Sequence, residues 1–198
     1  MGEAYAHEKG LVRRRVQTSR AGLSTSEVAR LSAAACARIV RLPIFATARH
    51  VVLYAPLGNE VDPTGIVDWA TRSAKALYYP FSAGGCVEFH RRRTGLLPDG
   101  RPGRPTDATL APSADAVLFL VPGIAFDPRG ARLGRGDGWY DRAFVRYPHG
   151  MRFGLAYEFQ VLPWLPEASW DVRMHAIVTE ARVICASPST GQSKENPR

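Results

Sequence analysis

The residues best suited to chemistry lie together in a glycine-rich segment, residues 132–141. They are three alternating glycines and two arginines, namely Gly134, Gly136, Gly138, Arg132 and Arg135. Because glycines lack side chains, their backbone N–H groups can approach a phosphate closely. The arginines add guanidinium groups that bind phosphate oxygens through paired hydrogen bonds. Asp141 follows one turn later, where a carboxylate could hold the magnesium ion that accompanies ATP.

Two known phosphate-binding patterns do not describe this segment. The P-loop pattern requires a Lys-Ser or Lys-Thr pair after its last glycine, and none follows these glycines. The dinucleotide-binding pattern is G-x-G-x-x-G, whereas the third glycine here comes one residue early. Composition therefore leaves two interpretations open, a phosphate-binding loop and a flexible surface turn.

The surrounding sequence predicts a single α/β domain with a mostly parallel central sheet and helices on both faces. Apolar or alternating runs indicate strands at 51–55, 76–79, 87–90, 117–121, 153–157, 176–178 and 183–185. Helices are expected over 3–20, from Ser24 to Pro43, from Asp62–Pro63 onward and from Trp139 onward. The glycine-rich loop 123–138 thus joins a buried strand to a helix. Ligands of open α/β sheets bind at such places, beyond the carboxyl ends of the strands.

Local signals mark the ends of several elements. Ser24 and Glu27 form a capping-box pattern, with Ser24 as the N-cap of the second helix. Asp62 is the expected N-cap of the third helix, with a proline at its first helical position. Pro80 is expected to stop the strand 76–79. Residues 94–113 are rich in proline and glycine and are expected to form a surface loop.

Length and composition indicate one globular domain. The 198 residues are 45% hydrophobic, and we expect a domain over 1–185 and a disordered tail over 186–198. No apolar run approaches the roughly 20 residues that cross a bilayer. The first residues lack an apolar signal core, so we expect a soluble, cytoplasmic protein. The three scattered cysteines form no disulfide or zinc pattern and are expected to be buried or half-buried thiols, Cys36, Cys86 and Cys185.

The net charge of +8 is concentrated in two patches. Residues 1–20 carry five basic and two acidic groups, and residues 91–104 carry five arginines and one aspartate, which gives +3 and +4. Nucleic acid is one class of partner for such patches, but no aromatic residues are interleaved with them. A few local cations serve a small phosphorylated molecule equally well.

The run RLGRGDGWYDR from Arg132 to Arg142 strongly resembles the R-L-G-x-G-x-G-Y-Y-D-R motif of the 5-formyltetrahydrofolate cyclo-ligases, also called methenyltetrahydrofolate synthetases. Other family motifs match in the family's order and spacing. These are Lys9 with Arg13, Glu60-Val61-Asp62, Pro122 to Asp127, Ala156-Tyr157 with Gln160, Asp171, and Thr179-Glu180. Each short match is weak alone, whereas the ordered set covers most of the chain and is specific.

The resemblance implies a NagB/RpiA/CoA-transferase-like α/β fold and an ATP- and magnesium-dependent ligase. Family members convert 5-formyltetrahydrofolate to 5,10-methenyltetrahydrofolate and release ADP and phosphate. Phosphorylation of the formyl oxygen makes that oxygen a good leaving group, so no protein nucleophile is required. The implied partners are ATP and a reduced folate, without membrane or nucleic acid, and the implied state is a monomer or a homodimer.

The resemblance also implies roles for individual residues. The implied ATP ligands are Lys9, Arg13, Arg132, Leu133, Gly134, Arg135, Gly136, Asp137, Gly138, Trp139 and Tyr140, of which Arg135, Tyr140 and Lys9 would be catalytic. The implied folate ligands are Ala55, Glu60, Arg135, Gly136, Gly138, Trp139 and Tyr157. The implied magnesium ligands are Asp141 and Asp171. Independently of the family, Lys9 and Arg13 are four residues apart and would share one helical face.

Four departures from the family pattern concern the folate side more than the ATP side. Trp139 replaces the first of two tyrosines, Trp170 replaces a histidine, and His175 stands where an aspartate is common. Arg104 lies in a loop that often carries G-x-x-E-P, and the glutamate is absent here. Two alternatives therefore stay open. One is a paralogue that uses the same ATP site on another formamide or small carboxylate, and the other is a non-catalytic nucleotide- or nucleic-acid-binding homologue.

Overall fold

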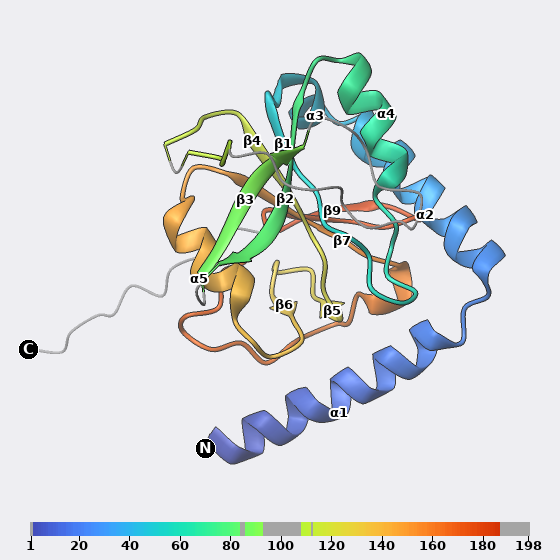
Figure 1. Ribbon diagram of the computed structural model, residues 1–198. Coiled ribbons are helices and arrows are strands. Elements are labelled where there is room, and N and C mark those ends of the chain that lie inside the picture. Colours follow the sequence, from blue (N-terminus) through green and yellow to red (C-terminus); the bar gives the residue numbers. More distant parts are fainter. Residues whose placement is uncertain (1, 84–85, 93–107, 112, 187–198) are drawn as a thin grey trace, which may run out of the picture.

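A seven-stranded sheet forms the centre of the computed structural model, which describes residues 2–83, 86–92, 108–111 and 113–186 (Figure 1). The strands run in the order β3-β2-β1-β4-β7-β8-β9. Their bounds are β1 His50–Val52, β2 Ala76–Ala83, β3 Cys86–Arg92, β4 Val117–Val121, β7 Met151–Leu155, β8 Ala176–Val178 and β9 Val183–Cys185. The five central strands are parallel, and the edge strands β3 and β9 are antiparallel to their neighbours. The predicted mostly parallel sheet is confirmed.

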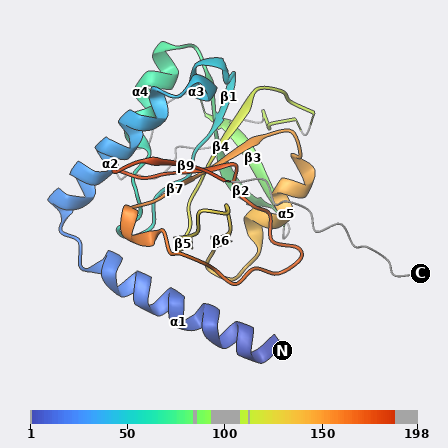
Figure 2. The ribbon, with the colours of Figure 1, turned by 180° about the vertical axis from the view of Figure 1, so that it is seen from behind.

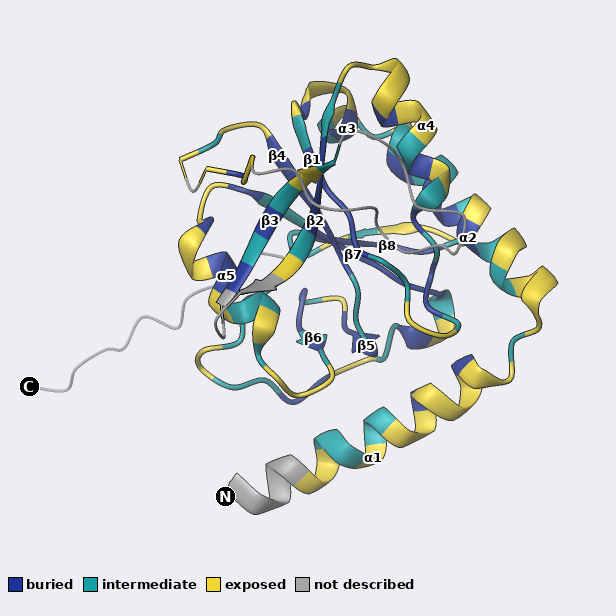
Figure 3. Cartoon of the chain, viewed as in Figure 1, coloured by how far each residue is buried: buried dark blue, intermediate teal, exposed yellow. Residues whose placement is uncertain are grey.

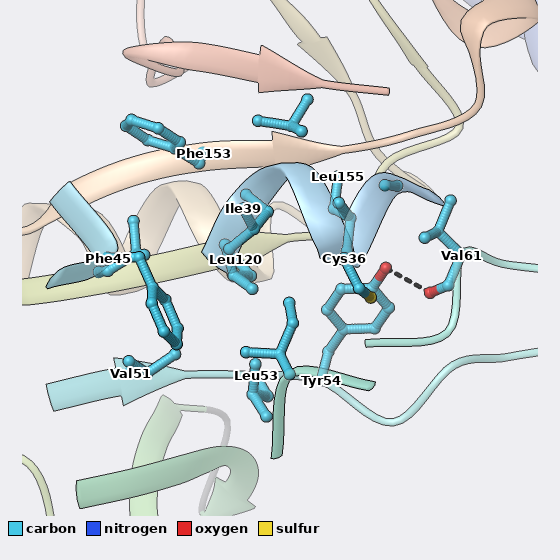
Figure 4. Packing of buried hydrophobic residues seen from close by; sticks show 14 of the residues in the cluster. Cys36, Ile39, Phe45, Val51, Leu53, Tyr54, Val61, Leu120, Phe153 and Leu155 are labelled. Atoms are coloured by element: carbon cyan, nitrogen blue, oxygen red, sulfur yellow. Dashed lines mark hydrogen bonds between the residues drawn. The ribbon is translucent and has the colours of Figure 1, made fainter. Parts of the chain in front are cut away.

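Helices cover both faces of this sheet, as predicted (Figure 3). The helices are α1 Gly2–Ala21, α2 Thr25–Val40, α3 Pro43–Thr47, α4 Thr64–Arg72 and α5 Trp139–Arg146, with a 3-10 turn η1 at Glu158–Gln160. Alternate residues of β4 point to opposite faces. Leu118 and Leu120 pack with α2, α3 and α4, where Cys36 and Ile39 meet the sheet (Figure 4). Phe119 packs on the other face with α5.

Helix α1 lies outside these two layers, beside a small β-hairpin (Figures 1 and 2). The hairpin pairs β5, Ala125–Phe126, with β6, Arg132–Leu133, inside the segment 123–138 that the sequence predicted to be a loop. A third, smaller apolar cluster joins α1 to it. Its members are Val12, Val16, Ile124, Ala125, Ala131, Leu133, Leu162 and Leu165. The attachment of α1 therefore depends on few apolar contacts and on the polar contacts described below.

The capping box at Ser24 is confirmed. The Ser24 hydroxyl accepts a hydrogen bond from the Glu27 backbone N–H at 3.3 Å, and the Ser24 N–H donates to the Glu27 carboxylate at 2.8 Å. Asp62 is not the N-cap of α4, against expectation, although its Oδ1 accepts a hydrogen bond from the Thr64 N–H at 2.9 Å just before that helix. The helix starts one residue later than predicted, with Pro63 at the N-cap position.

Several other predicted boundaries were wrong. The strand expected over 153–157 is β7, Met151–Leu155. Strand β1 ends at Val52, not at residue 55, because the chain beyond it turns toward the cavity described below. Pro80 does not stop β2, which continues to Ala83 paired with β3 alone, since β1 ends opposite Tyr78. A proline tolerates such a one-sided position because it lacks only one ladder donor. Helix α2 was expected to extend to Pro43, but it ends at Val40. Pro43 is the first residue of the short helix α3.

The remaining expectations concern the loop 94–113, the three cysteines, the tail and the absence of a membrane span. Most of the expected surface loop 94–113 lies outside the described residues, and within it Leu110 is buried in the second core cluster. Cys36 is buried as expected, Cys185 is exposed against expectation, and the side chain of Cys86 lies outside the described set. The expected tail lies outside it from residue 187 onward. No helix in the described part of the chain is long and apolar enough to cross a membrane.

Candidate active site

A cavity of about 430 Å³ lies beyond the carboxyl ends of β1 and β4. Segments from α1, from the chain after β1, from the chain after β4, from the loop between β6 and α5, and from the chain before β8 form its walls. The lining residues are Lys9, Arg13, Tyr54, Ala55, Leu57, Glu60, Pro122 to Ile124, Arg132 to Asp141, Trp170 and Asp171. This is the place where open α/β sheets bind ligands. The glycine-rich segment thus lines a cavity and does not project as a free turn.

The backbone of the glycine-rich loop requires glycine at two positions. Gly136 has a φ of 127° and Gly138 a φ of 62°, a region that residues with side chains rarely adopt. Gly138 is also the N-cap of α5, and it supplies no side chain to cap the helix. The first N–H groups of a helix have no partner inside that helix. A bound anion at the cavity could therefore accept from loop and helix N–H groups together.

Helix α1 presents one face to the cavity, which confirms the predicted pairing of Lys9 and Arg13. The Lys9 Nζ lies 3.0 Å from Oδ2 of Asp171. The Arg13 Nε donates to the Gly134 carbonyl at 2.9 Å. The helix therefore places two cations beside the glycine-rich loop.

Glu60 occupies another part of the cavity and is held by two hydrogen-bond donors and one further ion pair. The Arg135 Nη2 donates to its Oε1 at 2.9 Å, and the Leu57 N–H donates to its Oε2 at 3.0 Å. Arg20 forms an ion pair with the same Oε1 at 3.6 Å. The Arg20 side chain is 8% exposed, whereas that of Arg135 is 49% exposed. Arg135 is therefore the partner that a ligand of Glu60 can replace.

Arg132 and Asp141 form a pair at the start of α5. The Arg132 Nη2 donates to Oδ2 of Asp141 at 2.9 Å, and the Val172 N–H donates to Oδ1 at 3.1 Å. The Arg132 guanidinium also lies over the Tyr140 ring, 5.3 Å from its centroid. Burial raises the pKa of Tyr140, against a smaller opposing effect of Arg132. The Tyr140 hydroxyl therefore stays protonated at neutral pH and can donate a hydrogen bond.

Asp141 and Asp171 both line the cavity, as the predicted magnesium ligands should. In the described residues no group of three or more metal-ligating side chains is gathered. Magnesium commonly uses one or two carboxylates and completes its shell with water and substrate phosphates. The Asp171 contacts with Lys9 and with the Ala168 N–H both use Oδ2. Two carboxylates at one cavity, Asp171 paired with Lys9 and Asp141 paired with the buried Arg132, fit such an ion.

Tyr157 is the exception among the predicted ligands, because it does not line the cavity. It is fully buried in the first core cluster, and its ring stacks on Phe159 with the centroids 5.6 Å apart. Its motif partner Gln160 donates from Nε2 to the carbonyls of Gly123 and Ile124 at 3.0 and 2.8 Å. Through Gln160, the Ala-Tyr-x-x-Gln motif supports the cavity wall.

A second buried network stands behind the cavity, and we call it the Asp127 network. The Asp127 carboxylate is fully buried and accepts from the side chain and N–H of Arg129 at 2.6 to 3.0 Å. It also accepts from the N–H groups of Ala131 and Leu165 at 3.2 and 3.0 Å. The network closes the β5–β6 hairpin and joins it to the chain that leads toward β8.

Sequence reasoning missed several residues of the cavity. Pro122 and Ile124 directly follow β4, so the rule on carboxyl ends of strands could have found them. Trp170 could have been found, with less certainty, because it precedes the predicted site residue Asp171. Leu57 had no signal of its own, and the contact of Arg20 with Glu60 at the edge of the cavity depends on how α1 packs.

Comparisons of this chain with known proteins all lead to the same enzyme family. The profile of the 5-formyltetrahydrofolate cyclo-ligase family matches residues 5–180. The 5-formyltetrahydrofolate cyclo-ligase of Escherichia coli K12 is 25% identical over 178 residues, which cover 85% of this chain and 98% of that protein. The solved structure of Aquifex aeolicus 5,10-methenyltetrahydrofolate synthetase has a TM-score of 0.77 and 32% identity, and covers 96% of this chain and 99% of that one. The Mycoplasma pneumoniae synthetase has a TM-score of 0.72 and 25% identity, and covers 87% and 99%.

Proposed function

Because the chain belongs to the 5-formyltetrahydrofolate cyclo-ligase family, we propose that it converts 5-formyltetrahydrofolate to 5,10-methenyltetrahydrofolate while ATP becomes ADP and phosphate. One observation carries the ATP part of this proposal. The cavity brings Lys9 and Arg13 from the first helix to the loop 134–138, more than a hundred residues further along the chain. Two cations and a glycine-rich loop around one cavity suit a triphosphate.

The proposed chemistry proceeds in two steps. The formyl oxygen attacks the γ-phosphorus of ATP, and the bond to the β-phosphate oxygen breaks, so ADP leaves. The second folate nitrogen then attacks the formyl carbon and loses its proton, and the activated oxygen departs within inorganic phosphate. Both steps need alignment and charge stabilisation more than a covalent partner from the protein.

In the proposal, the residues at and near the glycine-rich loop bind the phosphates of ATP. In the proposal Lys9 and Arg13 bind phosphate oxygens, and the N–H groups of residues 134–138 bind others. Arg135 stabilises the charge that develops on the transferred group. The protonated Tyr140 hydroxyl donates to an oxygen of the same group. Lys9 reaches the phosphate by leaving Asp171, whose carboxylate becomes available at that moment.

In the proposal, Glu60 binds the pterin ring of the folate. Its carboxylate suits the N–H groups of a pterin ring, which are hydrogen-bond donors. A pterin at this position would replace the exposed guanidinium of Arg135. Substrate binding would thereby release Arg135 toward the phosphates. Bound through Asp141 and Asp171, magnesium would supply positive charge between the phosphate oxygens.

A direct assay tests the proposal. Purified protein is incubated with 5-formyltetrahydrofolate, ATP and magnesium, and the ultraviolet absorbance of the methenyl product and the release of ADP are followed together. We expect one ADP for each product molecule and no product without ATP. The absence of product at high protein concentration, with ATP binding intact, would reject formylfolate as the substrate.

A second candidate is the same ATP chemistry on another formamide or a small carboxylate. The observation that favours it is the state of Glu60, whose carboxylate is already satisfied by Arg135 and by the Leu57 N–H. A substrate without a pterin ring would leave these contacts in place. ADP release that depends on such a compound, and not on formylfolate, would select this candidate.

A further inference from the structure

Two of the tryptophans, Trp139 and Trp170, line the cavity and are exposed. Trp170 is 76% exposed and Trp139 is 40% exposed. Trp69 and Trp164, the other two, each carry an arginine over the ring, with the guanidinium 5.5 Å from the centroid. Within the described part of the chain, neither cavity tryptophan has an aromatic or cationic partner of this kind. A flat apolar ring left open at a cavity is an unfilled binding surface for another flat ring.

Helix α1 shows where Trp170 lies relative to Glu60. Lys9 contacts Asp171, the neighbour of Trp170, and Arg20 contacts Glu60. Lys9 and Arg20 are eleven residues apart on one helix, which corresponds to about 16 Å along its axis. Arg13 contacts the glycine-rich loop between these two points. The cavity therefore has a Glu60 end, a phosphate-binding middle and a Trp170 end.

The chemistry of the two ends differs. The Glu60 end offers a carboxylate and nearby hydrogen-bonding groups, and the proposed function assigns it to the folate. A nucleotide whose phosphates lie in the middle must direct its base away from the other substrate. The end that remains begins at Lys9 and Asp171, which the proposed function places at the phosphates, and continues to the exposed indole of Trp170.

We propose that Trp170 stacks on the adenine ring of ATP and thereby sets the affinity of the nucleotide. This inference rests on the proposed function, because it requires that nucleotide phosphates occupy the middle of the cavity. Stacking on an aromatic side chain tolerates different bases, since each base has a flat π-face. The contact should therefore strengthen nucleotide binding and discriminate weakly between adenine and guanine.

A binding experiment separates base stacking from phosphate binding. The dissociation constants of ATP and of inorganic tripolyphosphate, each with magnesium, are measured by calorimetry for the full-length wild-type protein. The same measurements are made on Trp170→Ala, Trp170→Phe and the control Trp69→Ala, which removes an exposed tryptophan of α4 outside the cavity. Circular dichroism confirms that each variant is folded.

Trp170→Ala should weaken ATP binding on the order of 10-fold, the scale of one base stacked on one aromatic ring, and leave tripolyphosphate binding unchanged. Trp170→Phe should restore most of the ATP affinity, and Trp69→Ala should match the wild type. Equal weakening of ATP and tripolyphosphate in Trp170→Ala would overturn the inference, because the effect would then act through Asp171. Unchanged ATP affinity in that variant would also overturn it and would leave the proposed function standing. A wild-type protein that binds neither ligand would refute both.

Discussion

Carboxylates occupy two neighbouring regions of this molecule, the Asp127 network and the wall of the cavity, and they are held in different ways. Asp127 is fully buried and accepts from a side chain and from three backbone N–H groups. Glu60, Asp141 and Asp171 each face the cavity and are paired with a cation that also lines it. The first arrangement holds a hairpin in place, and the second leaves partners that a ligand can exchange.

The two groups of carboxylates differ in whether another group can replace their hydrogen-bonding partners. Three of the donors around Asp127 are fixed N–H groups of the backbone, and without the carboxylate they would lose this acceptor. The cations in the cavity sit on long side chains, and phosphate oxygens can take over their hydrogen bonds. Position and partners, rather than residue type, therefore separate structural carboxylates from those proposed to act in the reaction.

The strongest test of this distinction is Asp141→Asn. The amide retains an oxygen for the Val172 N–H but lacks the charge proposed to act on magnesium. We expect turnover to fall by more than about 100-fold, while the free energy of unfolding changes by less than about 1 kcal/mol. Urea unfolding and the product assay measure the two quantities. The control Asp68→Asn, at an exposed position on α4, should change neither, and a large loss of stability in Asp141→Asn would contradict the comparison.

Asp127→Ala should have the opposite profile. Removal of the carboxylate leaves three backbone N–H groups without this acceptor and takes one partner from the Arg129 guanidinium, so the free energy of unfolding should fall by about 3 kcal/mol. Activity per folded molecule should change far less than in Asp141→Asn. The matched control Asp115→Ala removes an exposed partner of Arg49 and should shift stability by less than about 0.5 kcal/mol. Lost activity with unchanged stability would place Asp127 among the reacting groups.

Arg135→Ala sharpens the comparison at the folate end. It removes the exposed partner of Glu60 and a group proposed to stabilise charge on the transferred phosphate, so kcat/KM for ATP should fall at least about 10-fold with little change in stability. Arg146→Ala, at an exposed position on α5, should leave kcat/KM unchanged. Steady-state kinetics distinguish the two variants, and equal effects would show that net charge alone matters.

The smallest expected effect is a dependence of the stability on pH, and it arises from a histidine outside both regions. Burial lowers the pKa of His175, and the positive charge of Arg152 lowers it further. As pH falls below about 6.5, the unfolded chain takes up this proton before the folded one, so stability decreases with falling pH. His175→Gln should reduce this dependence in urea titrations. Part of it should persist through His50, whose pKa burial also lowers. A stability that rises on acidification would contradict the assignment.

The sequence predicted the parts of the fold that local patterns determine. The capping box at Ser24 and the apolar strand at 117–121 depend on residues that are close in the chain, and both are confirmed. The end of β1 and the passage of β2 through Pro80 depend on which strands pair, so local signals placed them wrongly. The β5–β6 hairpin was missed because each strand has only two residues.

The site was predictable where motifs were dense and not where long-range packing decides. The segment 132–141 and the pair Lys9 and Arg13 line the cavity as expected. Tyr157 lies in a matched motif, yet it is buried, because a motif match does not reveal whether a residue touches a ligand or supports the wall. The contact of Arg20 with Glu60 required the docked position of α1, which no local pattern determines.

The contact between Lys9 and Asp171 joins residues 162 positions apart. During synthesis the first of them leaves the ribosome early and the second only when the chain is nearly finished. Under the proposed function, nucleotide affinity should therefore arise late, after the strands of the sheet have assembled, since the cavity needs both residues and such distant residues come together slowly. Labelled ATP added to a translation reaction would consequently report on complete chains, and stalled or shortened products would escape its detection.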